Sequence, residues 1–244
     1  MDQTVDIAVI CGLELEAAPL VRRLRGRRKT VGNRFVLVEG SVASRRLVVA
    51  WTDGPTKRLT VAADAVLFTH KPRWLVAAGF AVGLSDAARI GDIVLASELV
   101  DEAGNCLNVG IRLAPEDAAA PGTHAGRLVS VARWPHSIAD KHDLHVRTGA
   151  VAADSQSFSL AKICAEQQTK FLAIRVLADD GSRDADPELL AVYHPSVKFR
   201  WGAAVGALLR GTGRATKVWK LRSAAKRHAE RLADFIVQVL PRLP

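Results

Sequence analysis

Short apolar runs alternate with amphipathic segments along most of the chain. The first run, Asp6–Gly12, is mostly apolar and ends in a glycine, which predicts a buried strand. The next segment, Leu13–Leu24, repeats its apolar residues at helical spacing and keeps its arginines off that stripe, which predicts a helix. Apolar runs that predict further strands recur at Phe35–Glu39, Arg46–Trp51, Trp74–Gly79, Ile93–Ser97, Gly126–Ala132, Ala150–Ala153 and Lys170–Leu177.

Helices and loops fill the intervals between these strands. Helical spacing recurs at Leu59–Phe68, at Ser157–Gln167 and in the tail from Phe199. Small residues at Phe80–Leu84 predict a turn, and the Gly-, Pro- and Ala-rich segment Ala103–Gly126 predicts a loop. Strands that alternate with helices favour an α/β fold with three layers, α/β/α, around a mostly parallel sheet.

The composition agrees with one globular domain over residues 1–244. Aromatic residues make up 5% of the chain, so we expect an aliphatic, alanine-rich core. The three cysteines, with no CxxC spacing, argue against a disulfide framework and against a zinc site, and we expect neither a metal nor a cofactor. Acids near the start argue against a signal peptide, and no apolar run reaches bilayer length, so we expect a cytoplasmic protein.

The net charge of +9 is concentrated partly in the tail, 198–244, where basic residues flank an apolar stripe. One interpretation is a helical segment that packs on the domain. The other is peripheral contact with the inner face of a membrane, where lysine and arginine meet anionic lipid. Nucleic acid is not an expected partner, because the chain lacks the aromatic interleaving or the named motif that such proteins carry.

Carboxylates and amides follow several of the predicted strands. Glu16 lies in the first turn after the first strand, Asp154 and Gln156 follow another, and Asp179 ends the last. Parallel strands would bring these groups together at the carboxyl edge of the sheet, where α/β proteins bind ligands. Each also has a structural interpretation: Glu16 can favour the helix dipole, Asp154 can cap a helix, and Asp179 with Asp180 can form a turn.

Four segments resemble the nucleoside phosphorylase and methylthioadenosine/S-adenosylhomocysteine nucleosidase superfamily. Ile7–Glu16 is similar to its opening strand and acidic helix, and Ala77–Leu84 followed by Gly91–Val94 is similar to its glycine-rich turn and the strand after it. Asp154–Cys164 and Arg175–Asp179 are similar to its ribose-binding and base-binding segments. The resemblance implies the nucleoside phosphorylase fold and, from relatives that form dimers or larger rings, a homo-oligomer.

The tail resembles one subgroup, the hopanoid-associated phosphorylases. The similarity lies in Pro187–Leu190, in Leu208–Arg210 and in the long basic helix that ends near Leu240. It implies cleavage of the N-glycosidic bond of a purine nucleoside by water or phosphate, with adenosylhopane, an adenine-bearing lipid of hopanoid biosynthesis, as the substrate.

The resemblance also implies roles for particular residues. Asp179 would give a hydrogen bond or proton to N7 of the departing purine, and Glu16 would hold the attacking water or lie near the nucleophile. Carboxylates near the sugar and an acid at the base suit a transition state with positive charge on the ribose and negative charge on the base. On the substrate side the implied residues are Asp154, Ser155, Gln156, Phe80, Gly79 and Trp134.

Three of these positions depart from the superfamily's pattern. Gln156 stands where a glutamate grips the ribose hydroxyls, Ser155 replaces a methionine, and Phe80 replaces a serine that helps phosphorylases to bind phosphate. The sequence therefore supports glycosidic cleavage better than phosphate as the nucleophile. It leaves open a second hypothesis, that the protein is a non-catalytic member that binds a nucleoside or serves as a scaffold.

Overall fold

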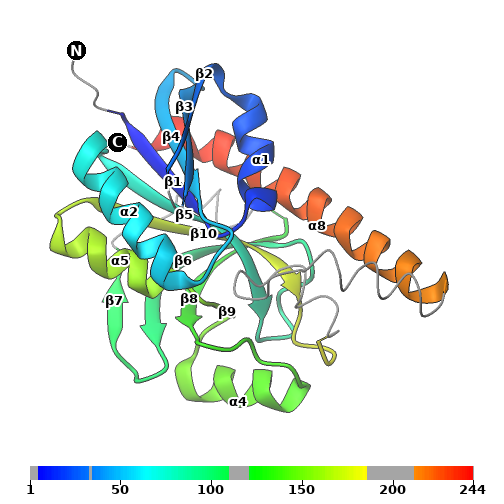
Figure 1. The fold of residues 1–244 in the computed structure, drawn as a ribbon. Coiled ribbons are helices and arrows are strands. Elements are labelled where there is room, and N and C mark those ends of the chain that lie inside the picture. Colours follow the sequence, from blue (N-terminus) through cyan, green and yellow to red (C-terminus); the bar gives the residue numbers. More distant parts are fainter. Residues whose placement is uncertain (1–4, 33–34, 110–120, 186–211, 244) are drawn as a thin grey trace.

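The computed structural model describes residues 5–32, 35–109, 121–185 and 212–243, with side chains from residue 219 onward in the last range. A ten-stranded mixed sheet runs through the described part in the order β10-β6-β8-β9-β5-β1-β4-β3-β2, with β7 paired to β6 (Figure 1). The strands are β1 Ile7–Cys11, β2 Arg25–Val31, β3 Val36–Val42, β4 Arg45–Trp51, β5 Trp74–Gly83, β6 Ile93–Asp101, β7 Cys106–Asn108, β8 Thr123–Ser130, β9 Ala152–Asp154 and β10 Lys170–Asp179.

The long strand β5 organises the sheet. It pairs in parallel with β1 and with β10, and its last residues, Val82 and Gly83, pair antiparallel with β9. Because β10 also pairs with β6, β6 with β8, and β8 with β9, five strands close into a ring. The sheet therefore curls at this end, and side chains from strands far apart in the sequence face one another there.

The turn predicted at Phe80–Leu84 is wrong. β5 continues through Gly83, with Phe80 opposite Val176 and Val82 opposite both Asp179 and Ala153. The segment is buried within the sheet between neighbouring strands, and Phe80 is one of the largest fully buried side chains in the described residues.

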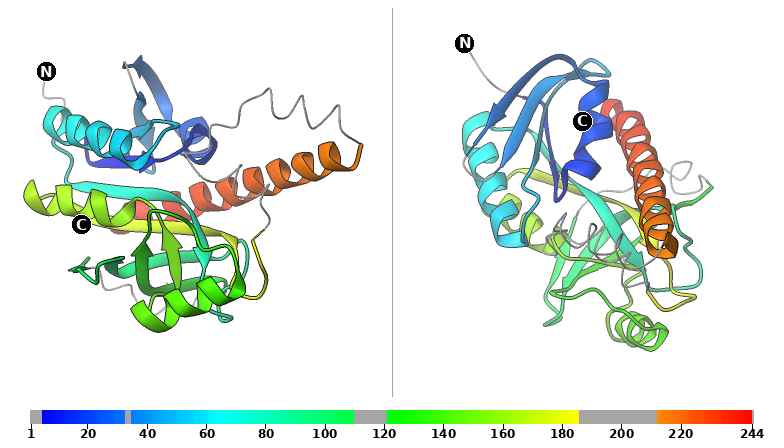
Figure 2. Two further views of the ribbon diagram at one scale, coloured as in Figure 1. Left: turned by 60° about the horizontal axis from the view of Figure 1, so that its bottom comes forward. Right: turned by 45° about the vertical axis from the view of Figure 1, so that its right-hand side comes forward.

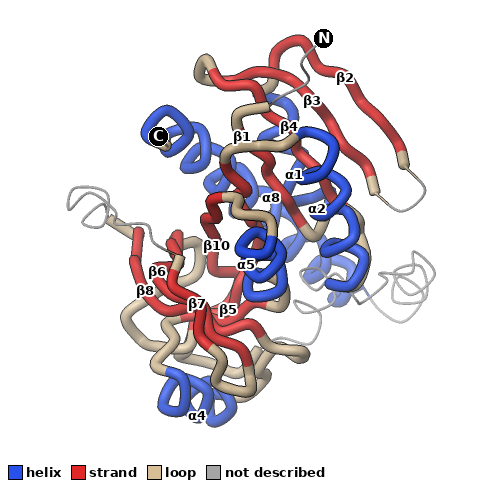
Figure 3. The backbone as a smooth tube through the Cα atoms, turned by 90° about the vertical axis from the view of Figure 1, so that its left-hand side faces the viewer, coloured by secondary structure: helices blue, strands red, loops and turns tan. Residues whose placement is uncertain are grey.

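Helices cover both faces of the sheet, as the three-layer prediction requires. α2 Thr56–His70 and α5 Ser157–Glu166 pack on one face, and α1 Glu14–Arg23 and α8 Thr212–Val239 pack on the other (Figures 1 and 2). Alternate residues of β1 show the same division, because Val9 faces the α1 and α8 layer whereas Ala8 faces the α2 and α5 layer. α4 Ile138–Thr148 lies apart, at the end where the ring of strands closes (Figure 3).

Other differences from the sequence predictions are local. The edge strand β2 was not predicted, because its residues Arg25–Val31 are exposed and basic and carry no apolar alternation. β7 lies inside the predicted loop, and α4 was not predicted at all. In the tail the described helix begins at Thr212, so residues 199–211 and the segments 187–190 and 208–210 fall outside the described residues.

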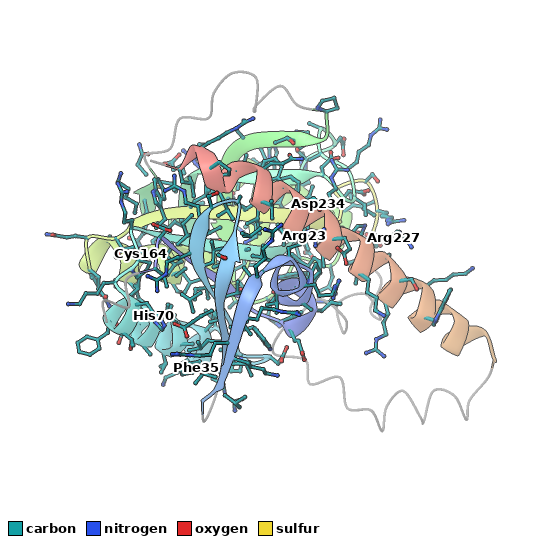
Figure 4. All side chains as sticks on the ribbon, turned by 90° about the horizontal axis from the view of Figure 1, so that it is seen from above. Arg23, Phe35, His70, Cys164, Arg227 and Asp234 are labelled. Atoms are coloured by element: carbon teal, nitrogen blue, oxygen red, sulfur yellow. The ribbon has the colours of Figure 1, made fainter. Side chains whose placement is uncertain are left out.

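The described part of the tail packs against the domain through its second half. Ala225, Ala229, Leu232 and Ile236 are buried in the layer that α1 shares. Arg23 of α1 donates to Glu230 and Asp234 of α8, and Figure 4 shows Arg23 facing Asp234 across the two helices. The first half of α8 projects beyond the sheet (Figure 2). None of the described helices is long and apolar enough to cross a membrane.

Candidate active site

Glu16 reaches from the first turn of α1 over the sheet to β5. Its Oε1 accepts the backbone N–H of Phe80 at 2.8 Å, and its Oε2 accepts the N–H of Leu13 at 2.8 Å. Burial raises the pKa of this carboxyl from 4.5 to about 7, while the nearby Arg175 guanidinium and the backbone N–H groups act in the opposite direction. Near neutral pH the group is therefore divided between its protonated and ionised forms, which suits a general base.

Gly79 makes room for this arrangement. A Cβ at this position would lie 2.5 Å from Nη1 of Arg175 and 2.6 Å from Oε1 of Glu16, far inside normal contact distance. In the β5–β10 register Gly79 stands directly opposite Arg175. Because Gly79 has no side chain, β5 leaves a space at this position, and Arg175 and Glu16 converge in it.

Arg175 is fully buried in the middle of β10. Its Nη2 lies 2.6 Å from Oδ2 of Asp154 and donates to Oγ of Ser157 at 2.9 Å. The resemblance covered Arg175 without giving it a role, although an arginine inside an otherwise apolar strand is itself a signal. A buried guanidinium needs an anionic partner and hydrogen bonds, so its position implied a polar centre on this strand.

Asp154 ends β9, and its carboxylate accepts hydrogen bonds from other residues of the protein. It accepts hydrogen bonds from Oγ of Ser130 at 2.6 Å, from Oγ of Ser157 at 2.5 Å and from the N–H of Ser157 at 3.1 Å. The carboxylate therefore accepts N–H groups at the start of α5, whose N-cap residue is Gln156, and forms an ion pair with Arg175.

Asp179 ends β10 and is also buried. The β5–β10 register shifts between Leu177 and Asp179, and such an irregularity changes the direction in which a side chain points. Its Oδ2 accepts a hydrogen bond from Nζ of Lys141 at 2.7 Å. The neighbouring Asp180 turns its carboxylate to Ser182 instead. Lys141 was missed because α4 was not predicted, and a lysine on a polar helix carries no signal of burial.

The remaining predicted residues lie around this centre. Gln156 is buried at the start of α5, whereas Ser155 lines a cavity of about 460 Å³ beside Ser130 and the first turn of α2. Phe80 and Trp134 are buried in the core layer that α1 and α8 cover. The structure thus brings Glu16, Gly79 and Arg175 together. Asp179 lies opposite Val82, two residues or about 7 Å along β5 from the N–H that binds Glu16.

Comparison with known proteins agrees with this architecture. The crystal structure of a 5'-methylthioadenosine/S-adenosylhomocysteine nucleosidase from Campylobacter jejuni superposes with a TM-score of 0.74 at 16% identity, covering 98% of this chain and 100% of the other. The futalosine hydrolase of Helicobacter pylori gives a TM-score of 0.74 at 15% identity, with 100% of both chains covered. The nucleosidase from Neisseria meningitidis in complex with methylthio-immucillin-A gives 0.67 at 19% identity, over 96% of this chain and 99% of the other.

At these identities the similarity establishes the fold, a single-domain α/β fold of the nucleoside phosphorylase type. No curated protein matches the chain significantly in sequence. Residues 6–198, however, match the family described as the Phosphorylase superfamily, and this match takes in β1, β5, β9 and β10 with the side chains they position. The chain therefore belongs to the Phosphorylase superfamily.

Proposed function

We propose that this protein cleaves the N-glycosidic bond of a purine nucleoside. The observation that carries the proposal is the convergence of Glu16 and Arg175 above Gly79. Asp179 is buried further along β10, the strand that also carries Arg175. Two of the similar structures support it by their printed names, since one is a 5'-methylthioadenosine/S-adenosylhomocysteine nucleosidase and the other a futalosine hydrolase.

The chemistry follows from where charge develops. As the bond between C1′ and the base breaks, its electron pair moves to the base and the ribose becomes electron-poor. Water then attacks C1′, and the proton it loses passes to Glu16, whose pKa of about 7 suits that transfer. The purine takes up one proton at N7, for which Asp179 is the proposed donor.

A finer proposal concerns the substrate. We propose adenine as the base and, from the resemblance of the tail to the hopanoid-associated phosphorylases, adenosylhopane as the nucleoside. Gln156 and Ser155, at the start of α5, are the proposed contacts to the sugar, with Trp134 as the proposed contact to the base. Water is favoured as the nucleophile, because the resemblance puts Phe80, whose aromatic ring is buried, where the superfamily has a serine that helps to bind phosphate.

The test is release of free adenine from adenosine that carries a large apolar 5′ substituent, with and without phosphate. Release without phosphate identifies a hydrolase, and release that requires phosphate identifies a phosphorylase. 5'-Methylthioadenosine and S-adenosylhomocysteine serve as comparison substrates. If none of them is cleaved and none binds, the proposal is wrong.

A non-catalytic role is the second candidate. Two departures from the superfamily's pattern favour it: the resemblance puts Gln156 in place of a glutamate and Phe80 in place of a serine. A protein of this kind would bind the nucleoside or act as a scaffold without turnover. Binding of adenosine measured by calorimetry, in a preparation that releases no adenine, would support this candidate.

Two partner proposals remain from the sequence. The exposed Trp219 with Lys220, Arg222 and Lys226 on α8 supports peripheral contact with anionic lipid. Binding to phosphatidylserine vesicles that disappears at high salt would support it, and absence of binding at low salt would refute it.

Val61 and Phe68, one above the other on the exposed face of α2, support a homo-oligomer. Light scattering that shows a monomer would refute that proposal.

A further inference from the structure

Lys141 lies in the first turns of α4 and is completely buried. A buried ammonium is costly unless it is paired and hydrogen-bonded. Its Nζ lies 2.7 Å from Oδ2 of Asp179, 2.7 Å from the carbonyl oxygen of Asp180 and 2.7 Å from the carbonyl oxygen of Arg183. An ammonium has three N–H donors, so all of them are used by β10 and the loop that follows it.

This arrangement has one feature that a simple loop anchor would not need. A neutral donor would be sufficient to hold the two carbonyl groups, whereas a carboxylate partner makes use of the charge. Within the described residues, Asp179 is the one carboxylate that forms an ion pair with Lys141. The loop is also held independently, because the side chain of Asp184 accepts the N–H of Ile138, and the N–H of Ala185 donates to His136.

Charged side chains approach Asp179 from more than one element. Lys141 approaches from α4, and Nε of Arg183, on an exposed side chain, lies 3.8 Å from Oδ1. β5 presents the apolar Val82, Asp180 is engaged by Ser182, and Asp92 on the adjoining turn pairs with His124. Lys141 is therefore the dominant charge acting on this carboxyl group.

We propose that Lys141 is a positioning residue for the glycosidic cleavage: it holds Oδ2 of Asp179 and leaves Oδ1 for the base. The inference rests on the proposed function and adds a residue to it. In the reaction, one proton passes from Oδ1 of Asp179 to N7 as the base departs with the bonding electrons. The carboxylate that remains is stabilised by the ammonium of Lys141, which keeps its own protons, and solvent returns the proton to Asp179 before the next turnover.

A residue that only held the loop would not need a charge at this position. A replacement that keeps N–H donors but is neutral therefore separates the positioning role from a purely structural one.

The decisive experiment compares Lys141→Gln with Lys141→Arg in adenine release, with kcat and KM measured separately. The two variants both retain N–H donors and differ chiefly in charge. We expect Lys141→Gln to lower kcat about tenfold with little change in KM, because Asp179 loses its charged support while the other substrate contacts remain. We expect Lys141→Arg to retain most of kcat.

Arg127→Met is the matched control. Arg127 pairs with Glu98 and donates to the carbonyl of Thr148, so it anchors the far end of the same helix α4 without contacting Asp179. Its loss should reduce stability and leave kcat unchanged. If Lys141→Gln does not fold, the double variant Lys141→Gln with Asp179→Asn removes both charges. It should then be no less active than Asp179→Asn alone, because Lys141 acts through Asp179.

The outcomes separate the two claims. If the wild-type protein neither releases nor binds an adenine nucleoside, the proposed function is wrong and this inference fails with it. If the wild-type protein is active but Lys141→Gln and Lys141→Arg have the same kcat, or the double variant is much less active than Asp179→Asn, Lys141 is a structural anchor and the inference alone is overturned.

Discussion

Arg175 and Asp154 form a buried ion pair that spans β5, with Nη2 and Oδ2 2.6 Å apart. Arg175 lies on β10, along one edge of β5, and Asp154 ends β9, which pairs with the other edge. The guanidinium crosses between them above Gly79, the residue of β5 directly opposite Arg175, where it also meets Glu16. One glycine thus allows three charged side chains from three elements to share a site.

The first prediction concerns that glycine. Gly79→Ala places a Cβ 2.5 Å from Arg175 and 2.6 Å from Glu16, so one or both side chains must move. We expect a loss of about 1–3 kcal/mol in the free energy of unfolding and a fall in kcat of about 100-fold, since small displacements at a reacting centre have large effects. Urea unfolding and adenine release measure the two quantities.

Gly26→Ala is the control for this change. It lies in open space on β2, and its positive φ of 62° makes alanine mildly strained there. It should reduce stability slightly and leave kcat unchanged. Equal activity of Gly79→Ala and the wild-type protein would show that the convergence of Glu16 and Arg175 is not needed for turnover.

The second prediction concerns pH-dependent stability. The pKa of Glu16 is raised on folding from 4.5 to about 7, so the folded protein binds more protons than the unfolded chain in that interval. The stabilisation from this proton is complete below pH 4.5 and is lost as pH rises to about 7. Its size is about 3 kcal/mol, an order-of-magnitude figure from the free energy that corresponds to each pKa unit.

Glu16→Gln tests this prediction, because glutamine keeps an oxygen for the N–H of Phe80 and does not titrate. Unfolding of both proteins by urea at several pH values should show the variant gaining on the wild type as pH rises, together with a large loss of turnover. A constant difference in stability across this range would contradict the raised pKa.

The third prediction concerns Arg175→Met. It leaves Asp154 buried without its cation, and we expect a loss of about 3–5 kcal/mol in the free energy of unfolding. It also removes the positive charge that lowers the pKa of Glu16, so that pKa should rise further above 7. The rise should appear as an upward shift of the acid limb of kcat/KM in whatever activity remains. An unshifted acid limb would mean that Glu16 is not the base.

The fourth prediction concerns Gln156, which is buried at the start of α5. If the side chain faces the ribose, Gln156→Glu supplies a charged acceptor for its hydroxyl groups, and turnover should rise about tenfold, because charge-assisted hydrogen bonds are the stronger ones. Ser159→Glu, one turn along the same helix, is the control for added charge. No gain from Gln156→Glu would show that glutamine is fully accommodated.

Apolar periodicity alone was sufficient for most strands and for α1, α2 and α5, because a buried face imposes its spacing on the sequence. Apolar periodicity failed to predict the elements that do not bury a regularly spaced apolar face. The edge strand β2 is exposed throughout, and α4 buries the polar Lys141. The small residues of Phe80–Gly83 resemble those of a turn, yet they lie between packed strands.

The sequence by itself determined the α/β class and the presence of acids after several strands, because both follow from local patterns. Which side chains meet was decided by the tertiary structure alone. The pairing of Asp179 with Lys141, of Asp154 with Arg175, and the approach of Glu16 to Phe80 join residues 38, 21 and 64 positions apart, as the numbering shows. Such contacts depend on strand order and register, and no local pattern in the chain encodes which distant charge will be buried beside another.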